Sequence, residues 1–253
     1  MVGVYLFYTL VKEVSLSQNL MRMALLASKN IDVLLNRVRH VRISKFYSPS
    51  SFYVQLLVED VKYNTLELEM LDYYGSQNFA VLLGTDTPLV RLKVADLKSG
   101  TLVAVEINGR WVRCKVLDAA SLRCRCIDDG DCVTLTYVNI LNGVYEIAEH
   151  LAVLPPRAVL CGLAFISPTT VSKKFWSFRA AEIFQQVTTN RTLSAYFVQL
   201  GECDDSVHVV ISSSGSHKSV IHVNTLLIAF NVAVQVMGDI HFRIRVDDEL
   251  EFE

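Results

Sequence analysis

Residues 100–130 read GTLVAVEINGRWVRCKVLDAASLRCRCIDDG, and this stretch decides the fold. It consists of short strand-like runs that are divided by turn signals. These signals are Asn108-Gly109, Asp118-Ala119-Ala120 and Asp128-Asp129-Gly130-Asp131. Strands so short and so closely spaced predict a small, strongly bent β-barrel over residues 92–142.

A hairpin and helices are expected before this barrel. Arg42–Phe46 and Ser51–Glu59 have strand patterns, and the turn between them contains Pro49, which a central ladder would not accommodate. Ser15–Val38 has apolar residues at helical spacing, which predicts an amphipathic helix or a pair of helices. A second helix is expected over residues 64–74, with an apolar face formed by Leu66, Met70, Tyr73 and Tyr74.

Mixed α and β segments are expected after the barrel. They are a short helix over residues 145–151, a strand over 158–166, a helix over 174–187, a hairpin over 194–212 and a helix over 220–232. The acidic end of the sequence is expected to form a frayed tail.

Composition narrows the class of protein. Of the 253 residues, 51% are hydrophobic and 20% are charged, which is typical of a packed globule and not of a disordered chain. The net charge of -2 provides no general attraction to phosphate backbones. Cysteines within strand-like runs, a poor signal peptide and no span of membrane length favour a soluble protein of the cytoplasm.

Three segments in order carry a resemblance to a known family. They are V-x-I-x-K-F-x-S-P-x-x-F-Y-V-Q at Val41–Gln55, then Gly100–Gly130, and L-P-P-x-A-V-x-C-x-L-x-x-I-x-P at Leu154–Pro168. Together they resemble the extended Tudor domain, in which an SH3-like Tudor barrel is inserted into a staphylococcal-nuclease-like OB barrel and joined to it by a helix. The resemblance covers residues 41–236 and implies a mainly β fold with helices, of the α+β class.

The resemblance implies a division of the chain into six parts. They are an N-terminal helical and apolar extension (1–40), the first strands of the nuclease-like barrel (41–60), a linker helix (61–91), the Tudor barrel (92–142), the remainder of the nuclease-like barrel (143–246) and an acidic tail (247–253).

The resemblance also implies a non-enzymatic reader of arginine-containing peptides, of the kind found in germline small-RNA proteins that recruit PIWI-clade Argonautes. Family members hold symmetrically dimethylated arginine between aromatic rings by cation-π attraction, beside an Asn or Asp. This chain departs from that pattern. The positions that correspond to the rings and to the Asn are occupied by Glu106, Val112, Cys126, Asp129 and Asp131. A Krimper-type repeat of fly germline granules is one place where such a cageless copy is expected.

Loss of the rings changes the expected ligand. Carboxylates attract an unmethylated guanidinium, which keeps its five N–H donors, more specifically than a methylated one. We therefore expect an adaptor that recruits an unmethylated arginine-rich tail of a PIWI-clade Argonaute in a perinuclear germ granule, the nuage. Asp128, Phe46 and Tyr47 are expected on the wall of the groove, although Asp-Gly pairs are also simply good turn residues.

Two alternatives remain open. The first is a scaffold with a decayed pocket, which self-associates through the apolar segment Met1–Val11. The second is single-stranded RNA binding by the OB-like barrel.

A basic strip on the small barrel is expected to be solvated; it consists of Arg110, Arg113, Lys115, Arg123 and Arg125.

No catalytic or metal site is expected. The cysteines of the small barrel lack paired C-x-x-C spacing and a nearby histidine, so they are interpreted as core thiols. The scattered histidines accompany no nucleophile motif. We thus expect neither a cofactor nor an enzyme.

Overall fold

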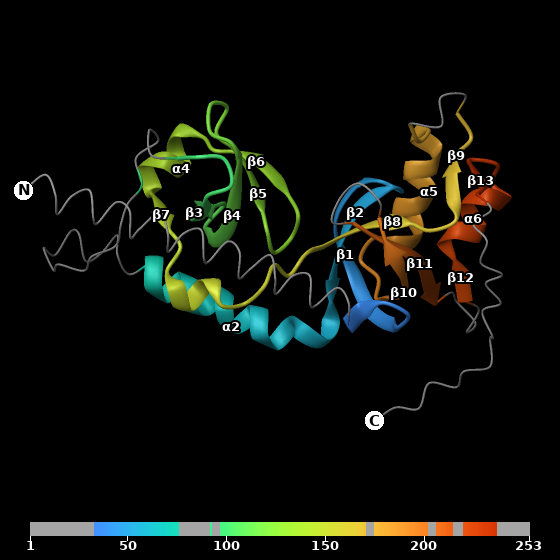
Figure 1. Cartoon of the computed structure of the whole chain (residues 1–253), viewed down its shortest axis with the longest axis horizontal. Helices are drawn as coiled ribbons and strands as arrows, with labels where there is room; N and C mark the ends of the chain where they lie inside the picture. Colours follow the sequence, from blue (N-terminus) through green and yellow to red (C-terminus); the bar gives the residue numbers. More distant parts are fainter. Residues whose placement is uncertain are drawn as a thin grey trace, which may run out of the picture.

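Two β-barrels joined by a helix make up the described part of the chain. The computed structural model describes residues 33–75, 92, 97–170, 175–201, 206–214 and 220–236. The barrels stand at opposite ends of an elongated molecule, and helix α2 runs from one to the other (Figure 1). The smaller barrel lies between segments of the chain that both belong to the larger one, so the predicted insertion is confirmed.

The larger barrel is built from strands of both chain halves. Its strands are β1 (Val38–Ser48), β2 (Ser51–Leu56), β8 (Val159–Leu163), β10 (Leu193–Leu200), β11 (Val207–Ser214) and β12 (Val220–His222). The order is β10-β1-β2-β8-β11-β12, and β11 also pairs with β10, which closes the barrel. The β8–β11 pairing is parallel, whereas β1, β2 and β8 pair antiparallel. Val41, Phe52, Phe197 and Ile211 are fully buried in its core.

Two helices and a small sheet cover this barrel. They are α5 (Phe178–Thr188), α6 (Val223–Ala229), and the pair β9 (Ile166–Pro168) and β13 (Ala233–Gln235). Helix α5 begins where the Ser177 hydroxyl accepts a hydrogen bond from the Ala180 N–H, at 3.2 Å. This cap explains why the helix starts later than the predicted residue 174.

The smaller barrel is a meander of short strands. They are β3 (Leu102–Ile107), β4 (Arg110–Asp118), β5 (Arg123–Cys126), β6 (Cys132–Thr134) and β7 (Val144–Glu146), in the order β6-β5-β4-β3-β7. Helix α4 (Tyr137–Asn142) connects β6 to β7. Asn108 and Gly109 both have positive φ, at 53° and 78°, as the two-residue hairpin turn requires. The expected Asn-Gly turn is therefore confirmed.

Helix α2 packs on the outside of the smaller barrel. The 3₁₀ turn η1 (Leu57–Glu59) leads into α2 (Asp60–Met70), which ends in the π turn η2 (Leu71–Gly75). Tyr63, Leu66, Met70 and Tyr74 recur at helical spacing and are buried. They pack against Ala104, Trp111 and Tyr145 of the smaller barrel and against Leu151. Leu151 lies in residues 147–158, between β7 and β8, which we call the return segment.

Some predicted elements differ from the structure. Residues 144–146 form β7, not the start of a helix, because they pair with β3; only the 3₁₀ turn η4 (Glu149–Ala152) is helical there. Residues 220–222 form β12 against β11, so α6 starts at Val223. β7 also extends the small barrel beyond the expected boundary at residue 142. The apolar segment 1–11, most of the helix expected over 15–38 and the acidic tail lie outside the described residues.

Candidate functional site

A small cleft lies where α2, the smaller barrel and the larger barrel meet, and we call it the inter-barrel cleft. Its volume is about 60 Å³. Its lining comes from α2 (Tyr63, Leu66, Glu67, Met70), from the smaller barrel (Arg110, Trp111, Val112, Arg113, Cys126, Asp128, Asp129), and from Gln55 and Arg157.

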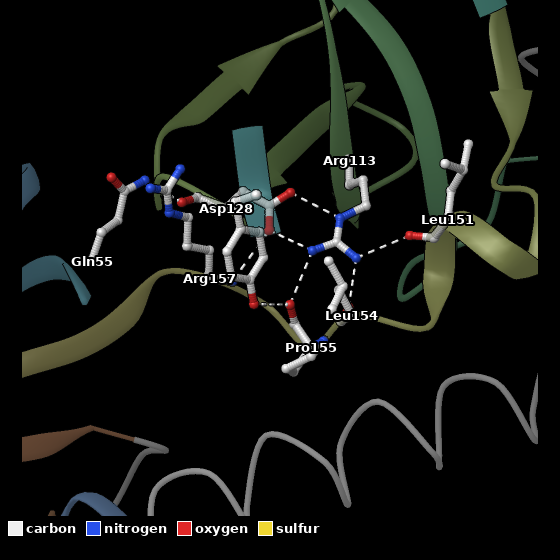
Figure 2. A network of polar contacts seen from close by, with 8 residues as sticks. Gln55, Arg113, Asp128, Leu151, Leu154, Pro155 and Arg157 are labelled. Carbon is white, nitrogen blue, oxygen red and sulfur yellow. Dashed lines mark hydrogen bonds and ion pairs between the residues drawn. The ribbon is translucent and has the colours of Figure 1, made fainter. Parts of the chain in front are cut away.

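A fully buried arginine forms the floor of this region. The Arg113 guanidinium donates to both carboxylate oxygens of Asp128, from Nε at 2.8 Å and from Nη2 at 2.5 Å. It also donates to the carbonyl oxygens of Leu151 at 3.1 Å, Leu154 at 2.6 Å and Pro155 at 3.0 Å (Figure 2). All five guanidinium donors are therefore used, and Arg113 is unavailable to a ligand. The solvated role predicted for Arg113 is wrong, because its side chain ties β4 to the return segment.

A chain of polar contacts extends from Asp128 to the larger barrel. The Gln55 side-chain amide donates to the Asp128 carbonyl oxygen at 2.6 Å and accepts from Arg42 Nε at 2.8 Å. Arg42 and Arg157 both pair with Asp60 at the start of α2, the Arg42 pair at 2.9 Å. We call this set of residues the junction network; it consists of Arg42, Gln55, Asp60, Arg113, Asp128 and Arg157. It connects both barrels and the helix.

The aromatic rings of the cleft already have partners. The Arg157 guanidinium lies 5.1 Å from the centre of the Tyr63 ring, and the Tyr63 hydroxyl donates to the Pro155 carbonyl at 2.8 Å. Trp111 is buried and stacks on Tyr74 at 5.2 Å. The cleft therefore has aromatic residues in its lining, but their faces are occupied by the protein's own groups.

One ion pair at the cleft is exposed. Arg110 Nε donates to the Glu67 carboxylate at 2.6 Å, which links the β3–β4 hairpin to α2. The two side chains are 66% and 41% exposed, in contrast to 0% for Arg113. Such exposed pairs contribute little to stability.

Asp129 is the cleft carboxylate without a cationic partner. Glu67 pairs with Arg110, and Asp128 pairs with Arg113, whereas Asp129 forms no ion pair within the described part of the chain. One Asp129 oxygen accepts the N–H of Asp131 at 2.7 Å. Burial is the main cause of a raised pKa for Asp129, and that N–H offsets part of the effect. A half-buried carboxylate of this kind would gain from a cation.

The structure separates the residues predicted for the degenerate cage. Val112, Cys126 and Asp129 line the cleft, as does the predicted wall residue Asp128. Glu106 and Asp131 are not in its lining. Glu106 lies opposite Trp111 in the β3–β4 ladder, and Asp131 pairs with Lys45 at 2.6 Å.

Phe46 and Tyr47, the other predicted wall residues, lie on the β1–β2 hairpin outside the cleft lining. Phe46 stacks on Phe184 at 4.7 Å and packs on the larger core. Tyr47 is 45% exposed, and its hydroxyl donates to the Gly130 carbonyl oxygen at 3.0 Å. Tyr47 thus holds the turn that carries Asp129.

Most of the cleft-lining residues that do not belong to the predicted cage were not identified from the sequence. Glu67 was not among the predicted site residues, because no sequence signal indicated against which surface the helix would pack. The buried role of Arg113 has one signal: it is two residues from Trp111 on the same strand face, which the helix covers.

Within the described ranges, no helix is long and apolar enough to cross a membrane. The same ranges contain no group of three or more His, Cys, Asp or Glu side chains arranged to hold a metal ion.

A five-stranded barrel inserted into a larger barrel, with a polar cleft at their junction, defines a two-lobed module of the extended Tudor type. The family model of the Tudor domain matches residues 34–164, just over half of the chain. The chain therefore belongs to the Tudor domain family.

Solved structures share the fold over most of the chain. The extended Tudor domain TD3 of mouse TDRD1, in complex with a MILI peptide containing dimethylarginine, has a TM-score of 0.66 and 20% identity; the match covers 80% of this chain and 95% of that one. The extended Tudor domain of Drosophila melanogaster Papi has a TM-score of 0.66 and 20% identity, with 79% and 100% covered. A Papi variant in complex with an unmethylated Piwi N-terminal peptide has a TM-score of 0.63 and 19% identity, with 79% and 100% covered. The predicted fold class is thus confirmed.

A curated relative is similar in sequence. RING finger protein 17 of Mus musculus is 23% identical over 201 residues, which are 78% of this chain and 11% of that protein. The chain therefore spans about a tenth of the length of this relative.

Proposed function

We propose that the chain is a non-catalytic peptide-binding adaptor that holds an arginine-containing segment of a partner protein at the inter-barrel cleft. The observation that carries the proposal is Asp129, a half-buried carboxylate in the cleft lining that has no ion pair among the described residues. A buried charge is favourable only when it is paired and hydrogen-bonded, and a guanidinium supplies both.

The walls of the cleft favour an arginine without methyl groups. Val112 and Cys126 have no π face, and the ring of Tyr63 already has the Arg157 cation above it. A dimethylated guanidinium would lose N–H donors without gaining aromatic contact. The unmodified side chain keeps all five donors, of which Asp129 can accept more than one.

The proposed partner is an N-terminal peptide of a PIWI-clade Argonaute, and the proposed location is the perinuclear germ granule. Support comes from the structural neighbours, whose solved complexes contain MILI and Piwi peptides. Both modified and unmodified peptides occur among those complexes, so the methylation preference rests on the residues of the cleft.

Fluorescence anisotropy with three versions of one PIWI-tail peptide tests the proposal: unmodified, symmetrically dimethylated, and with lysine in place of arginine. We expect the unmodified peptide to bind best. Asp129→Asn should weaken it at least about tenfold, because a hydrogen bond to a charged group is worth roughly 1.5–3 kcal/mol.

Asp131→Asn is the matched control, since this neighbouring carboxylate pairs with Lys45 outside the cleft lining. It should bind within about twofold of the wild type, as expected for an exposed pair. Absence of binding by every peptide, or preference for the dimethylated one regardless of Asp129, would contradict the proposal.

A further inference from the structure

Arg110 is an arginine of the chain itself that lines the inter-barrel cleft and contacts a carboxylate there. It comes from the tip of the β3–β4 hairpin, and its Nε lies 2.6 Å from a carboxylate oxygen of Glu67 on α2. Both residues belong to the cleft lining, together with Asp129. The chain's own guanidinium therefore covers a cleft bordered by carboxylates.

Arg110 interacts electrostatically with both acids, and all three residues line the cleft. The hydrogen bond to Glu67 is the main cause of the raised pKa of Arg110, and Asp129 contributes in the same direction. Conversely, Arg110 offsets a small part of the effect of burial, which raises the pKa of Asp129. A cation at this position therefore interacts favourably with Glu67 and with Asp129.

We propose that Arg110 is a displaceable internal substitute for the ligand, and that Glu67 is the second carboxylate of the binding site. This inference rests on the proposed function. An incoming arginine takes the place of Arg110 at Glu67 and is held there by Glu67 and Asp129. Arg110 swings into solvent, which its exposure of 66% permits.

The contrast with Arg113 explains why, of these two arginines, Arg110 is the one that can be exchanged. Arg113 is fully buried, and its five donors reach Asp128 and three carbonyl groups, so removing it would leave several buried acceptors unpaired. Arg110 forms a single exposed ion pair, and little free energy is lost when solvent or another cation replaces one partner of such a pair.

A site with two carboxylates has a defined specificity. A planar guanidinium presents donors on more than one edge and can engage two acids, whereas a lysine ammonium is a compact point charge on a single atom. Symmetric dimethylation replaces one N–H on each of the two terminal nitrogens and therefore weakens the contacts with both acids. The ligand class is thus an unmodified arginine, and Glu67 is a specificity-determining residue.

The test compares wild type, Arg110→Gln, Glu67→Gln and the double variant in anisotropy titrations with the unmodified peptide. Lys62→Gln, which removes an exposed positive charge from the same helix without touching the cleft lining, is the matched control. We expect Arg110→Gln to bind about two- to fivefold more tightly, the range that an exposed ion pair supports. Glu67→Gln should bind more weakly than wild type, and the double variant more weakly than Arg110→Gln alone. Lys62→Gln should match the wild type.

The outcomes separate this inference from the proposed function. Weaker binding by Arg110→Gln would show that Arg110 contacts the peptide, and the inference would be overturned. The inference also fails if Arg110→Gln and the double variant both equal the wild type while Asp129→Asn still loses binding; in that case the proposed function stands. Absence of binding by the wild type and by all variants overturns the proposed function itself.

Discussion

Asp128 is the counter-charge of Arg113, whose side chain is fully buried, so breaking this ion pair is expected to be strongly destabilising. The carboxylate receives two guanidinium N–H groups and the backbone N–H of Arg157 at 3.1 Å. We expect Asp128→Asn to lower the free energy of unfolding by roughly 3–5 kcal/mol, because Arg113 would remain buried without a counter-charge. Urea denaturation measures the loss. Glu67→Gln, which breaks the exposed pair, should lose at most about 1 kcal/mol; equal losses for both variants would contradict the difference in burial.

We expect the ionised form of Asp129 to strengthen peptide binding and to lower the free energy of unfolding. Burial raises its pKa above 3.8, so between that value and the raised one the folded chain binds more protons than the unfolded chain. Its contribution to stability therefore falls as pH rises through this window and stays unfavourable above it. Asp129→Asn keeps an oxygen for the Asp131 N–H but removes the charge. We expect its melting temperature, relative to wild type, to increase as pH rises above 3.8.

Peptide binding should show the opposite dependence on pH. A guanidinium binds the ionised form of Asp129, so wild-type affinity should rise with pH through the same window, and Asp129→Asn should lack this rise. Thermal melts and anisotropy titrations at matched pH values measure the two quantities. Parallel pH profiles for wild type and variant would indicate that Asp129 titrates neither in folding nor in binding.

Individual residues were only partly predictable from the sequence. The motif alignment grouped Val112, Cys126 and Asp129, and these three line one cleft, because a turn and two short strands fix their positions locally. The burial of Arg113 had only its alternation with Trp111 as a signal, because the carbonyl groups that pair with it lie about forty residues later in the chain. The same holds for Glu67, whose partner lies in a different element.

At the level of elements, the turn between β5 and β6 sets the geometry of the cleft. Gly130 has a φ of +84°, and a Cβ there would overlap the ring of Tyr53. Gly109 has a φ of +78° but nothing within 4 Å, so it is a matched control. Gly109→Ala should lose about 1–2 kcal/mol from backbone strain alone. Gly130→Ala should lose a further 1–3 kcal/mol or so from overpacking, together with peptide binding. Equal stability and unchanged affinity of the two variants would show that the turn tolerates displacement.

Elements were predicted best where local chemistry determines them. The Asn108-Gly109 hairpin and the apolar face of α2 follow from turn preferences and helical spacing, and both are present. The strand β7 was missed, because three residues carry too little pattern and their pairing with β3 spans some forty positions. Non-local pairing of short segments is the kind of information that a single sequence does not display.

At the scale of the whole molecule, the two barrels and the helix that joins them were predicted from the family resemblance, but the polar contacts that hold the barrels together were not. The junction network converts separate lobes into one unit through contacts of Asp60, Gln55 and Asp128. Gln55 and Asp128 belong to segments that carry the family resemblance, but their part in the network was not predicted, because each contacts a partner from a distant part of the chain. A cleft bordered by both lobes keeps its shape only if the relative position of the lobes is fixed, so the proposed binding mode requires a rigid junction.

The two tryptophans of the chain can test that rigidity, since there is one for each lobe. Trp111 lies between α2 and the smaller barrel, and the indole N–H of Trp176 donates to the Ser50 hydroxyl of the larger barrel at 2.7 Å. In Trp111→Phe and Trp176→Phe, the remaining fluorophore reports on one lobe. We expect the two urea transitions to coincide, because the junction network couples the lobes. Adding Asp60→Asn, which removes the counter-charge of Arg42 and Arg157, should separate the midpoints. Separate midpoints without that change would mean that the lobes unfold independently and that the cleft depends on local contacts alone.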